Sequence, residues 1–485
     1  MAEDERPRIP ASEILAKIER GEPVEYDGVI IFGDIDLRSL DKEDIKIVKS
    51  SIKITNSYLQ GLLDFGDSIL NGDVDFDGTI FGNSIFFNGT TFENALFSNS
   101  IFYRSANFSH AIFNKDAVFT SSNFLSQCFF LSSTFCMHTN FVGAKFEGIT
   151  NFQCSVFKSS VNFAGCNFNS YISFSGSNFK ESLDFVESSF GGSAQFDYIQ
   201  SDGDAFFMRC IFSGDADFQV SKFKRSADFT STIFGGNTRF RSSEFGENAY
   251  FSDSEFNESV DFCISKFHGR ADFNKCTFER DIDFKESVFF DNVEFCTTNF
   301  NGSADFSYSR FDKHIVFEGS EFDALTFRDA KLEWPSSQEA ACRRAKMAQE
   351  KNGDREEAGY HFYREMDGKR KQKPWYIRYP ELVLIQWIFG YGVHPLRLWA
   401  CWLGFVGLFA LLFWYYQGID ETASQMNTTV TAADYIWFSI ATAVTPGYAG
   451  YKPTSDFKLW AGLEAIIGTF MWAAFITTFA RKYMR

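Results

Sequence analysis

A short segment near the C-terminus combines glycine, threonine and tyrosine within an otherwise apolar region. It reads TAVTPGYAGYKP and spans residues 442–453. Glycine tolerates a positive φ, which lets successive backbone carbonyls of an extended strand point to the same side. A set of such carbonyl oxygens can replace the water around a cation. A turn between two buried helices would also explain the glycines, but not the helix-like run that leads directly into them.

Two long apolar segments enclose this motif. Residues 396–416 contain one charge, Arg397 at the start, and residues 459–480 form the second segment. Both are long enough to cross a bilayer, and their terminal aromatic residues are typical of the membrane–water interface. Irregular backbone at membrane depth is tolerated only where it lines a cavity. The alternative is a pair of buried helices in a soluble protein.

Basic residues precede the first apolar segment and follow the second. They are Lys369, Arg370, Lys371, Lys373, Arg378, Arg481, Lys482 and Arg485. The connecting loop 417–431 has no Lys or Arg. Because basic residues mark the cytoplasmic side, we expect a multi-pass cell-membrane protein with both termini in the cytoplasm. Residues 374–395 are rich in Trp and Tyr and predict an interfacial helix.

The segment SIATAVTPGYAGYKPTS (439–455) resembles the pore signature of potassium channels, and the resemblance covers about residues 396–484. It implies a two-helix pore-loop domain that assembles as a homotetramer, because one chain cannot enclose such a pore. The permeant ions would be K⁺ or Na⁺, with no other cofactor or metal. The implied sites are a selectivity filter at Thr445, Pro446, Gly447, Tyr448, Ala449 and Gly450, a pore helix with Ser439 and Thr442, and an inner-helix hinge with Glu464 and Gly468.

The filter departs from the family pattern at several positions. Pro446 replaces Val and lacks an N–H group. Ala449 replaces the second Gly, Gly450 stands at the position of an Asp, and Val444 replaces a buried Thr. Each change reshapes the outer filter, so we expect a weakly selective monovalent cation channel.

Phenylalanine dominates the rest of the chain, with 62 residues. From Phe141 the spacing alternates between five and six, skips one position near Ser201 and continues to Phe327, which gives a period of eleven. This period could indicate a right-handed helical supercoil. Units such as ADFTSTIFGGN (227–237) are rich in residues of low helix propensity, however, and favour a narrow β-solenoid.

This repeat resembles the pentapeptide-repeat family over roughly residues 54–332. The resemblance implies a right-handed quadrilateral β-helix in which Phe and the residue two before it point inward. Every second side carries one extra residue, expected at a corner. A coil of about 22 residues gives about twelve coils stacked at the spacing of β-strands.

The remaining segments define the other domains. Residues 1–53 are expected to cap the solenoid, with a helix over 10–23 that has Ser12 as N-cap and Gly21 as C-cap. Residues 333–373 predict a helical hairpin linker, 374–395 the interfacial helix and 396–485 the channel domain. We expect the basic stretch 369–378 to couple the cytoplasmic part to the pore.

Composition narrows the function further. The net charge of −17 argues against binding nucleic acid. The ten Cys show no metal-ligand spacing, and Cys128, Cys166, Cys210 and Cys276 are expected to be small buried residues in a reducing compartment. The six His fit no metal site or catalytic triad, so we do not expect an enzyme.

Two functions therefore remain. The first is a tetrameric cation channel in the lipid bilayer whose cytoplasmic solenoid regulates it or binds an unknown partner or ligand. The alternative is a membrane-tethered pentapeptide-repeat interaction protein or DNA mimic that does not conduct ions. The mixing of acidic and basic residues, as in KFKRSADF (222–229), weakens the DNA-mimic interpretation.

Overall fold

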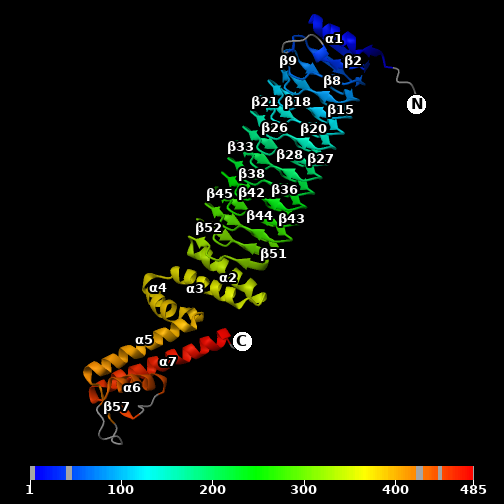
Figure 1. Cartoon of the computed structure of the whole chain (residues 1–485). Coiled ribbons are helices and arrows are strands. Elements are labelled where there is room, and N and C mark those ends of the chain that lie inside the picture. The colour runs from blue at the N-terminus through cyan, green and yellow to red at the C-terminus, as the bar shows by residue number, and fades with distance from the viewer. Residues whose placement is uncertain (1–5, 40–45, 422–429, 446–449, 484–485) are drawn as a thin grey trace. The chain divides into compact units, whose positions relative to one another are not determined.

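The computed structural model describes residues 6–39, 46–421, 430–445 and 450–483. The chain divides into two compact units, Met1–Gly353 and Asp354–Arg485. The first unit is a β-solenoid whose strands succeed one another along its length in chain order, and the second unit is mainly helical (Figure 1).

Each coil of the solenoid consists of four short strands. A typical coil contains β38 (Ala227–Asp228), β39 (Ile233–Phe234), β40 (Thr238–Arg239) and β41 (Glu244–Phe245). The chain then returns in β42 (Ala249–Tyr250), which pairs in parallel with β38 and sets Ala249 opposite Ala227, 22 residues earlier. The predicted quadrilateral β-helix is therefore confirmed as a four-sided parallel solenoid.

Parallel sheets run along the sides of the solenoid. Two sheets have 14 described strands each, from β2 (Val24–Asp27) to β53 (Ile315–Val316) and from β5 (Lys46–Val48) to β55 (Lys331–Leu332). The other two sides form a single 27-stranded sheet because β51 (Asn299–Asp305) pairs with strands on both of them. The solenoid has about 14 turns rather than about twelve, because β2 and β5 already lie within residues 1–53.

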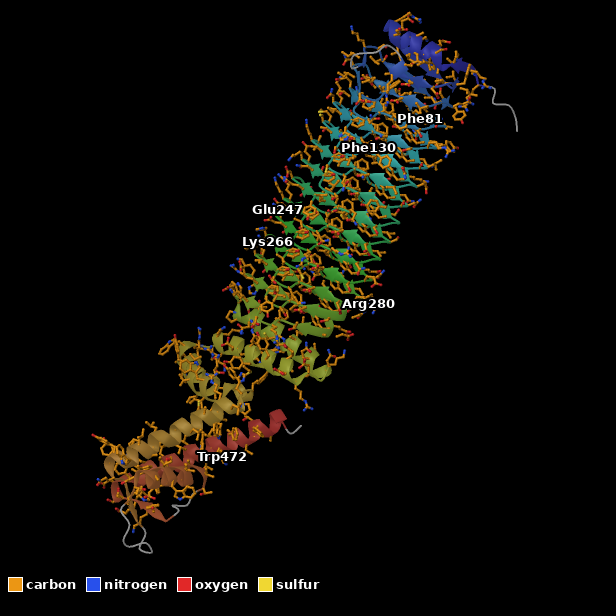
Figure 2. All side chains as sticks on the ribbon, in the orientation of Figure 1. Phe81, Phe130, Glu247, Lys266, Arg280 and Trp472 are labelled. Atoms are coloured by element: carbon orange, nitrogen blue, oxygen red, sulfur yellow. The ribbon has the colours of Figure 1, made fainter. Side chains whose placement is uncertain are left out.

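Stacked phenylalanine rings fill the interior. Phe229 is fully buried, and its ring centroid lies 4.8 Å from that of Phe207 and 5.0 Å from that of Phe251. The next column meets it edge-on, with Phe240 at 5.3 Å. Figure 2 shows Phe81 and Phe130 inside the same core. Each buried Phe contributes about 1.5–3 kcal/mol, so the ring columns are the main source of the solenoid's stability.

One ring is missing from these columns, as the sequence predicts. Ser201 pairs in register with Phe179 and Phe223 and is fully buried.

The neighbouring residue Asp202 has a lowered pKa. Desolvation acts to raise this pKa, but hydrogen bonds from Gln200, Lys224 and Lys180 outweigh desolvation and hold the pKa at about 2.

The corners explain the alternating spacing of five and six. In the five-residue step, Thr232 N donates to Phe229 O at 3.2 Å, and Ser231 between them adopts φ +57°. The same left-handed conformation recurs every eleven residues, for example at Ser242 (φ +59°) and Asp253 (φ +58°). The extra residue of the six-residue step lies in the other corner, at residues 235–237.

Small polar side chains hydrogen-bond each coil to the preceding one from inside. Thr232 Oγ1 donates to Phe207 O at 2.6 Å, and Ser243 Oγ donates to Phe218 O at 2.6 Å. Cysteine takes the same position at Cys210, whose Sγ lies 3.0 Å from Phe185 O. Cys128, Cys166, Cys210 and Cys276 are all buried free thiols, as predicted, and burial raises the pKa of each.

A helix covers each end of the solenoid. Helix α1 (Ala11–Arg20) buries Ile14 and Ile18 and ends at Gly21 in the left-handed conformation, as predicted. Its N-cap is Pro10 rather than Ser12, because β1 (Arg8–Pro10) leads directly into the helix. Helix α2 (Pro335–Lys351) packs on the last strands and places Ala341, Ala345 and Ala348 in the phenylalanine core.

Polar side chains near the end of α2 satisfy the exposed strand edge. Gln349 Nε2 donates to Leu325 O at 3.0 Å, and Asn352 Nδ2 donates to Asp323 O at 2.7 Å. These carbonyls belong to β54 (Glu321–Thr326), in the last turn. Because an open edge invites further pairing, α2 closes the solenoid.

The C-terminal unit begins with α3 (Arg355–Lys371), α4 (Trp375–Glu381), a π-helical turn η2 (Leu382–Ile388) and a 3-10 turn η3 (Gly390–Gly392). Helix α5 (Pro395–Tyr416), strand β56 (Ile419–Glu421), helix α6 (Ala432–Val444), strand β57 (Tyr451–Pro453), turn η4 (Ser455–Phe457) and helix α7 (Lys458–Tyr483) follow. Helices α5, α6 and α7 all contact one another.

Candidate functional site

Helices α5 and α7 have the length and composition to cross a membrane. The apolar segments are Pro395–Tyr416 and Ser455–Ala480. Within the single chain, only 33% and 22% of an 18-residue apolar stretch of each helix are buried. Leu411, Ile466 and Phe470 are each more than 60% exposed. The core helices of a soluble protein would be mostly buried, whereas these two helices leave most of their apolar surface uncovered within the single chain.

Helix α6 is too short to cross a bilayer. Its 13 residues extend about 20 Å at 1.5 Å per residue. It begins with a capping box in which Thr431 N donates to Asp434 Oδ2 at 2.6 Å. It ends at Val444, and Thr445 is already extended at φ −136°. The next residue is Pro446, which disfavours helix at the residue before it.

Helix α6 buries one face against its neighbours. Tyr435, Phe438, Ser439, Thr442 and Ala443 are buried at the spacing of a single helix face. The predicted pore-helix residues Ser439 and Thr442 therefore both point into the packed interior of this unit. Thr442 Oγ1 has no hydrogen-bond partner among the described atoms.

Ser439 joins all three helices. Its Oγ lies 2.9 Å from Val406 O on α5 and is also hydrogen-bonded to Glu464 Oε1 on α7. Both Ser439 and Glu464 are fully buried. Ser439 Oγ is the donor toward both acceptors, so one side chain ties the middle of α6 to α5 and to α7.

Gly468 lies where α7 passes closest to the end of α6. A Cβ atom at this position would lie 2.6 Å from Ala443 Cβ and 2.7 Å from Ala443 Cα, far inside van der Waals contact. Thr469 Oγ1 is 3.5 Å from Ala443 O at the same crossing. Glycine is thus needed here for space. The predicted hinge at Gly468 remains a prediction.

The candidate filter is described only at its two ends. Thr445 is exposed, and its Oγ1 donates to Ala441 O at 3.1 Å. Gly450 adopts φ +92°, a conformation that other residues rarely take. Pro446, Gly447, Tyr448 and Ala449 lie outside the described residues, so their predicted roles remain predictions.

The two segments that flank α6 meet beyond its ends. Strand β56, which follows α5, pairs antiparallel with β57, which follows the candidate filter, and Ile419 lies opposite Pro453. The chain therefore leaves α5 and returns to α7 at the same end of the unit.

The basic residues before α5 are mostly paired with acids. Lys369 lies 2.7 Å from Glu365, Arg370 2.7 Å from Asp367, and Lys371 2.6 Å from the same Asp367. Lys373 lies 2.7 Å from Glu381. Arg370 is also buried. Of the predicted membrane-surface cluster, Arg378 is exposed, while the side chains of Arg481, Lys482 and Arg485 lie outside the described part of the structure.

Sequence reasoning missed two parts of this site. The carbonyl of Val406 belongs to the backbone, so no residue type reveals it. Ala443 becomes important only through its contact with Gly468, although a small residue at the end of the pore helix could have suggested a close approach. No group of three or more His, Cys, Asp or Glu that could hold a metal ion occurs among the described side chains.

Comparison with protein families matches two separate regions of the chain. The family described as pentapeptide repeats (9 copies) matches residues 141–189 and 265–310, and the family described as ion channel matches residues 399–485. No curated protein and no solved structure matches significantly. Neither of the two families is a family of enzymes. The chain therefore joins a pentapeptide-repeat β-solenoid to a C-terminal ion-channel domain with two apolar helices of membrane-spanning length.

Proposed function

We propose that four copies of the chain form a membrane pore for monovalent cations, with the segment 445–450 of each copy as the selectivity filter. The pore helices would be α6, the outer helices α5 and the inner helices α7. Backbone carbonyls and the Thr445 hydroxyl would replace the hydration shell of K⁺ or Na⁺.

One observation carries the proposal: α6 is a short apolar helix anchored between two helices of membrane-spanning length. Ser439 fixes its middle to Val406 and Glu464, and Gly468 lets α7 approach its end. An isolated half-helix would leave its terminal carbonyls unsatisfied in lipid. Facing copies around an axis would give these groups water and ions instead.

We expect weak selectivity between K⁺ and Na⁺. Pro446 has no N–H group to anchor the filter strand, and Ala449 stands where a glycine is expected. If Ala449 keeps a positive φ, the strand loses about 1–2 kcal/mol of stability. A loosened outer filter fits its ions less closely.

The solenoid would lie in the cytoplasm with both chain termini and would regulate the pore or bind a partner. The basic stretch 369–378 would link the solenoid to the pore, and Gly468 would serve as hinge of the inner helix. No arginine-rich span precedes residue 396, so voltage is not the expected stimulus.

Ion flux into proteoliposomes tests the proposal. The wild-type protein should take up both K⁺ and Na⁺, and Gly447→Asp should abolish uptake by placing a carboxylate in the filter. Gly165→Asp is the matched control, because Gly165 has φ +65° with no atom within 4 Å of the place a Cβ would take, and Asp253 occupies the same type of corner. Equal flux from the wild type and Gly447→Asp, or no flux from the wild type, would refute conduction and favour the membrane-tethered interaction protein.

A further inference from the structure

One corner of the solenoid exposes bulky apolar residues in the left-handed conformation. Val220 has φ +57° and is 38% exposed, and Ile264 has φ +62° and is 40% exposed. Tyr198 (φ +57°) and Tyr308 (φ +60°) occupy the same column and are 62% and 59% exposed. A positive φ in a β-branched residue costs free energy.

The diagonally opposite corner serves as an internal comparison. It adopts the same conformation and, in the coils of the first column, carries only polar or charged residues. These are Arg209, Ser231, Asp253, Lys275 and Thr297. The turn itself therefore does not require apolar residues. The first column, which we call the apolar ridge, consists of Tyr198, Val220, Ser242, Ile264, Glu286 and Tyr308, four of which are apolar or aromatic.

Oppositely charged residues flank the apolar ridge at most of its levels. Each pair consists of the outward residue three positions before the corner and the outward residue two positions after it. The pairs are Asp217 and Lys222, Arg239 and Glu244, Asp261 and Lys266, and Asp305 and Arg310. Lys222 and Lys266 are exposed and form no ion pair with any described residue, and Figure 2 shows Lys266 on the outer surface. Arg239, Asp261, Asp305 and Arg310 already have ion-pair partners within the same chain.

We propose that the apolar ridge is a pairing surface for the solenoid of a second copy of this chain, with the two solenoids parallel. A two-fold axis parallel to the ridge places each ridge residue against its own copy, so that four levels bring apolar or aromatic residues together while Glu286 meets a like charge. It also sets the two members of each flanking pair opposite each other across the axis, so that Asp261 of one copy faces Lys266 of the other at the same level. Antiparallel packing would instead bring like flanks together.

The parallel arrangement also agrees with the C-terminal unit. In two parallel solenoids, the chain continues from residue 353 into the second unit at the same end of both copies, as two subunits in one bilayer would require. The pairing does not depend on conduction, however: a chain that forms no pore could still pair through the ridge, and a working channel could lack the pairing.

Cysteine cross-linking of the full-length protein tests the pairing. Ser242 lies on the ridge between Val220 and Ile264 and is exposed, so Ser242→Cys should give a subunit dimer after oxidation or with a short bis-maleimide. The native Cys154 is exposed on the same corner and is first replaced by Ser. Ser231→Cys is the matched control, because Ser231 is exposed in the same turn at the opposite corner.

The expected result is at least tenfold more dimer from Ser242→Cys than from Ser231→Cys. Equal yields, or no dimer from either with both reagents, would overturn the proposal. Adding Val220→Asn and Ile264→Asn should lower the yield at least fivefold while the melting temperature stays the same or rises, since Asn tolerates a positive φ. An unchanged yield would contradict the role of the ridge.

Reversing one charge tests the contribution of the flanking residues separately from that of the ridge residues. Lys266→Glu should lower the yield from Ser242→Cys, because an acidic side chain would then face Asp261 of the partner subunit. Lys145→Glu is the control, since Lys145 is equally exposed at the first position of a strand on another side of the solenoid. Equal yields from these two variants would contradict the parallel arrangement.

Discussion

Replacement of Gly468 by alanine probes the contact that holds the end of α6. The new Cβ would lie 2.6 Å from Ala443 Cβ, 2.7 Å from Ala443 Cα and 3.0 Å from Ala443 O. Two of these atoms belong to the backbone of α6, so the clash cannot be relieved by rotating a side chain. Helix α7 must therefore move away from the end of the candidate pore helix.

Gly462→Ala is the matched control on the same helix, because a Cβ at Gly462 would have no atom within 4 Å. Alanine gains roughly 0.8–1 kcal/mol over glycine in helix propensity, and this gain applies to both variants. Overpacking costs about 1–3 kcal/mol. The two variants should therefore differ in stability by about 1–3 kcal/mol, with Gly468→Ala the less stable.

The assay is thermal unfolding of the purified protein in detergent, together with ion flux in proteoliposomes. Gly468→Ala should unfold at a lower temperature than Gly462→Ala and conduct less. Adding Ala443→Gly removes the nearest atom and should restore part of both properties, whereas a pure hinge role for Gly468 predicts no recovery of flux. Identical unfolding and flux in the two alanine variants would refute the close-contact reasoning.

Three further variants test the hydrogen bonding and the core. Glu464→Gln keeps an acceptor for Ser439 and should unfold near the temperature of the wild type, while Glu464→Ala should lose about 1–3 kcal/mol; a Gln variant as unstable as the Ala variant would show that the bond to Ser439 does not stabilise this unit. Phe207→Ala should lower the stability of the solenoid by about 3–5 kcal/mol and move its denaturation midpoint, whereas the neighbouring Phe206→Ala, which points outward, should change it little. The lowered pKa of Asp202 stabilises the fold above the unfolded-state pKa of about 3.9, and this contribution is lost as the pH falls toward 2. Asp202→Asn should therefore reduce the dependence of the melting temperature on pH over that range. An unchanged dependence on pH would argue against the ion pairs of Asp202 with Lys180 and Lys224.

The architecture of the solenoid could be predicted because every coil repeats the same pattern of one large and one small inward residue, such as Phe229 and Ala227. This period, together with the low helix propensity of the residues between them, excludes a helix. The first coil escapes this reasoning because residues 24–48 carry mainly Ile and Val rather than Phe. Aliphatic side chains fill the same inward positions without showing the aromatic period.

For the channel domain, the sequence predicts the order of the helices along the chain but not the contacts between their side chains. Helix lengths and the glycine-rich segment follow from local sequence. The bond from Ser439 to Val406 O joins residues 33 positions apart, and its acceptor is a backbone atom that any residue type would provide. The ion pairs of Lys369 and Arg370 with nearby acids were also missed, because charge counting along the chain does not reveal which side chains meet.

The eleven-residue repeat constrains how such a chain can change in length. Inserting one full coil of 22 residues would lengthen the solenoid by a single strand spacing of about 4.8 Å and leave every corner where it was. Inserting eleven residues just after Ser242 would exchange the two left-handed corners beyond that point, so that Ile264 would join the column of Ser231 and Asp253 would join the column of Val220. The length of the solenoid can thus change in evolution by whole coils without moving any corner. A duplication of half a coil would instead divide the apolar ridge into two parts at diagonally opposite corners of the solenoid.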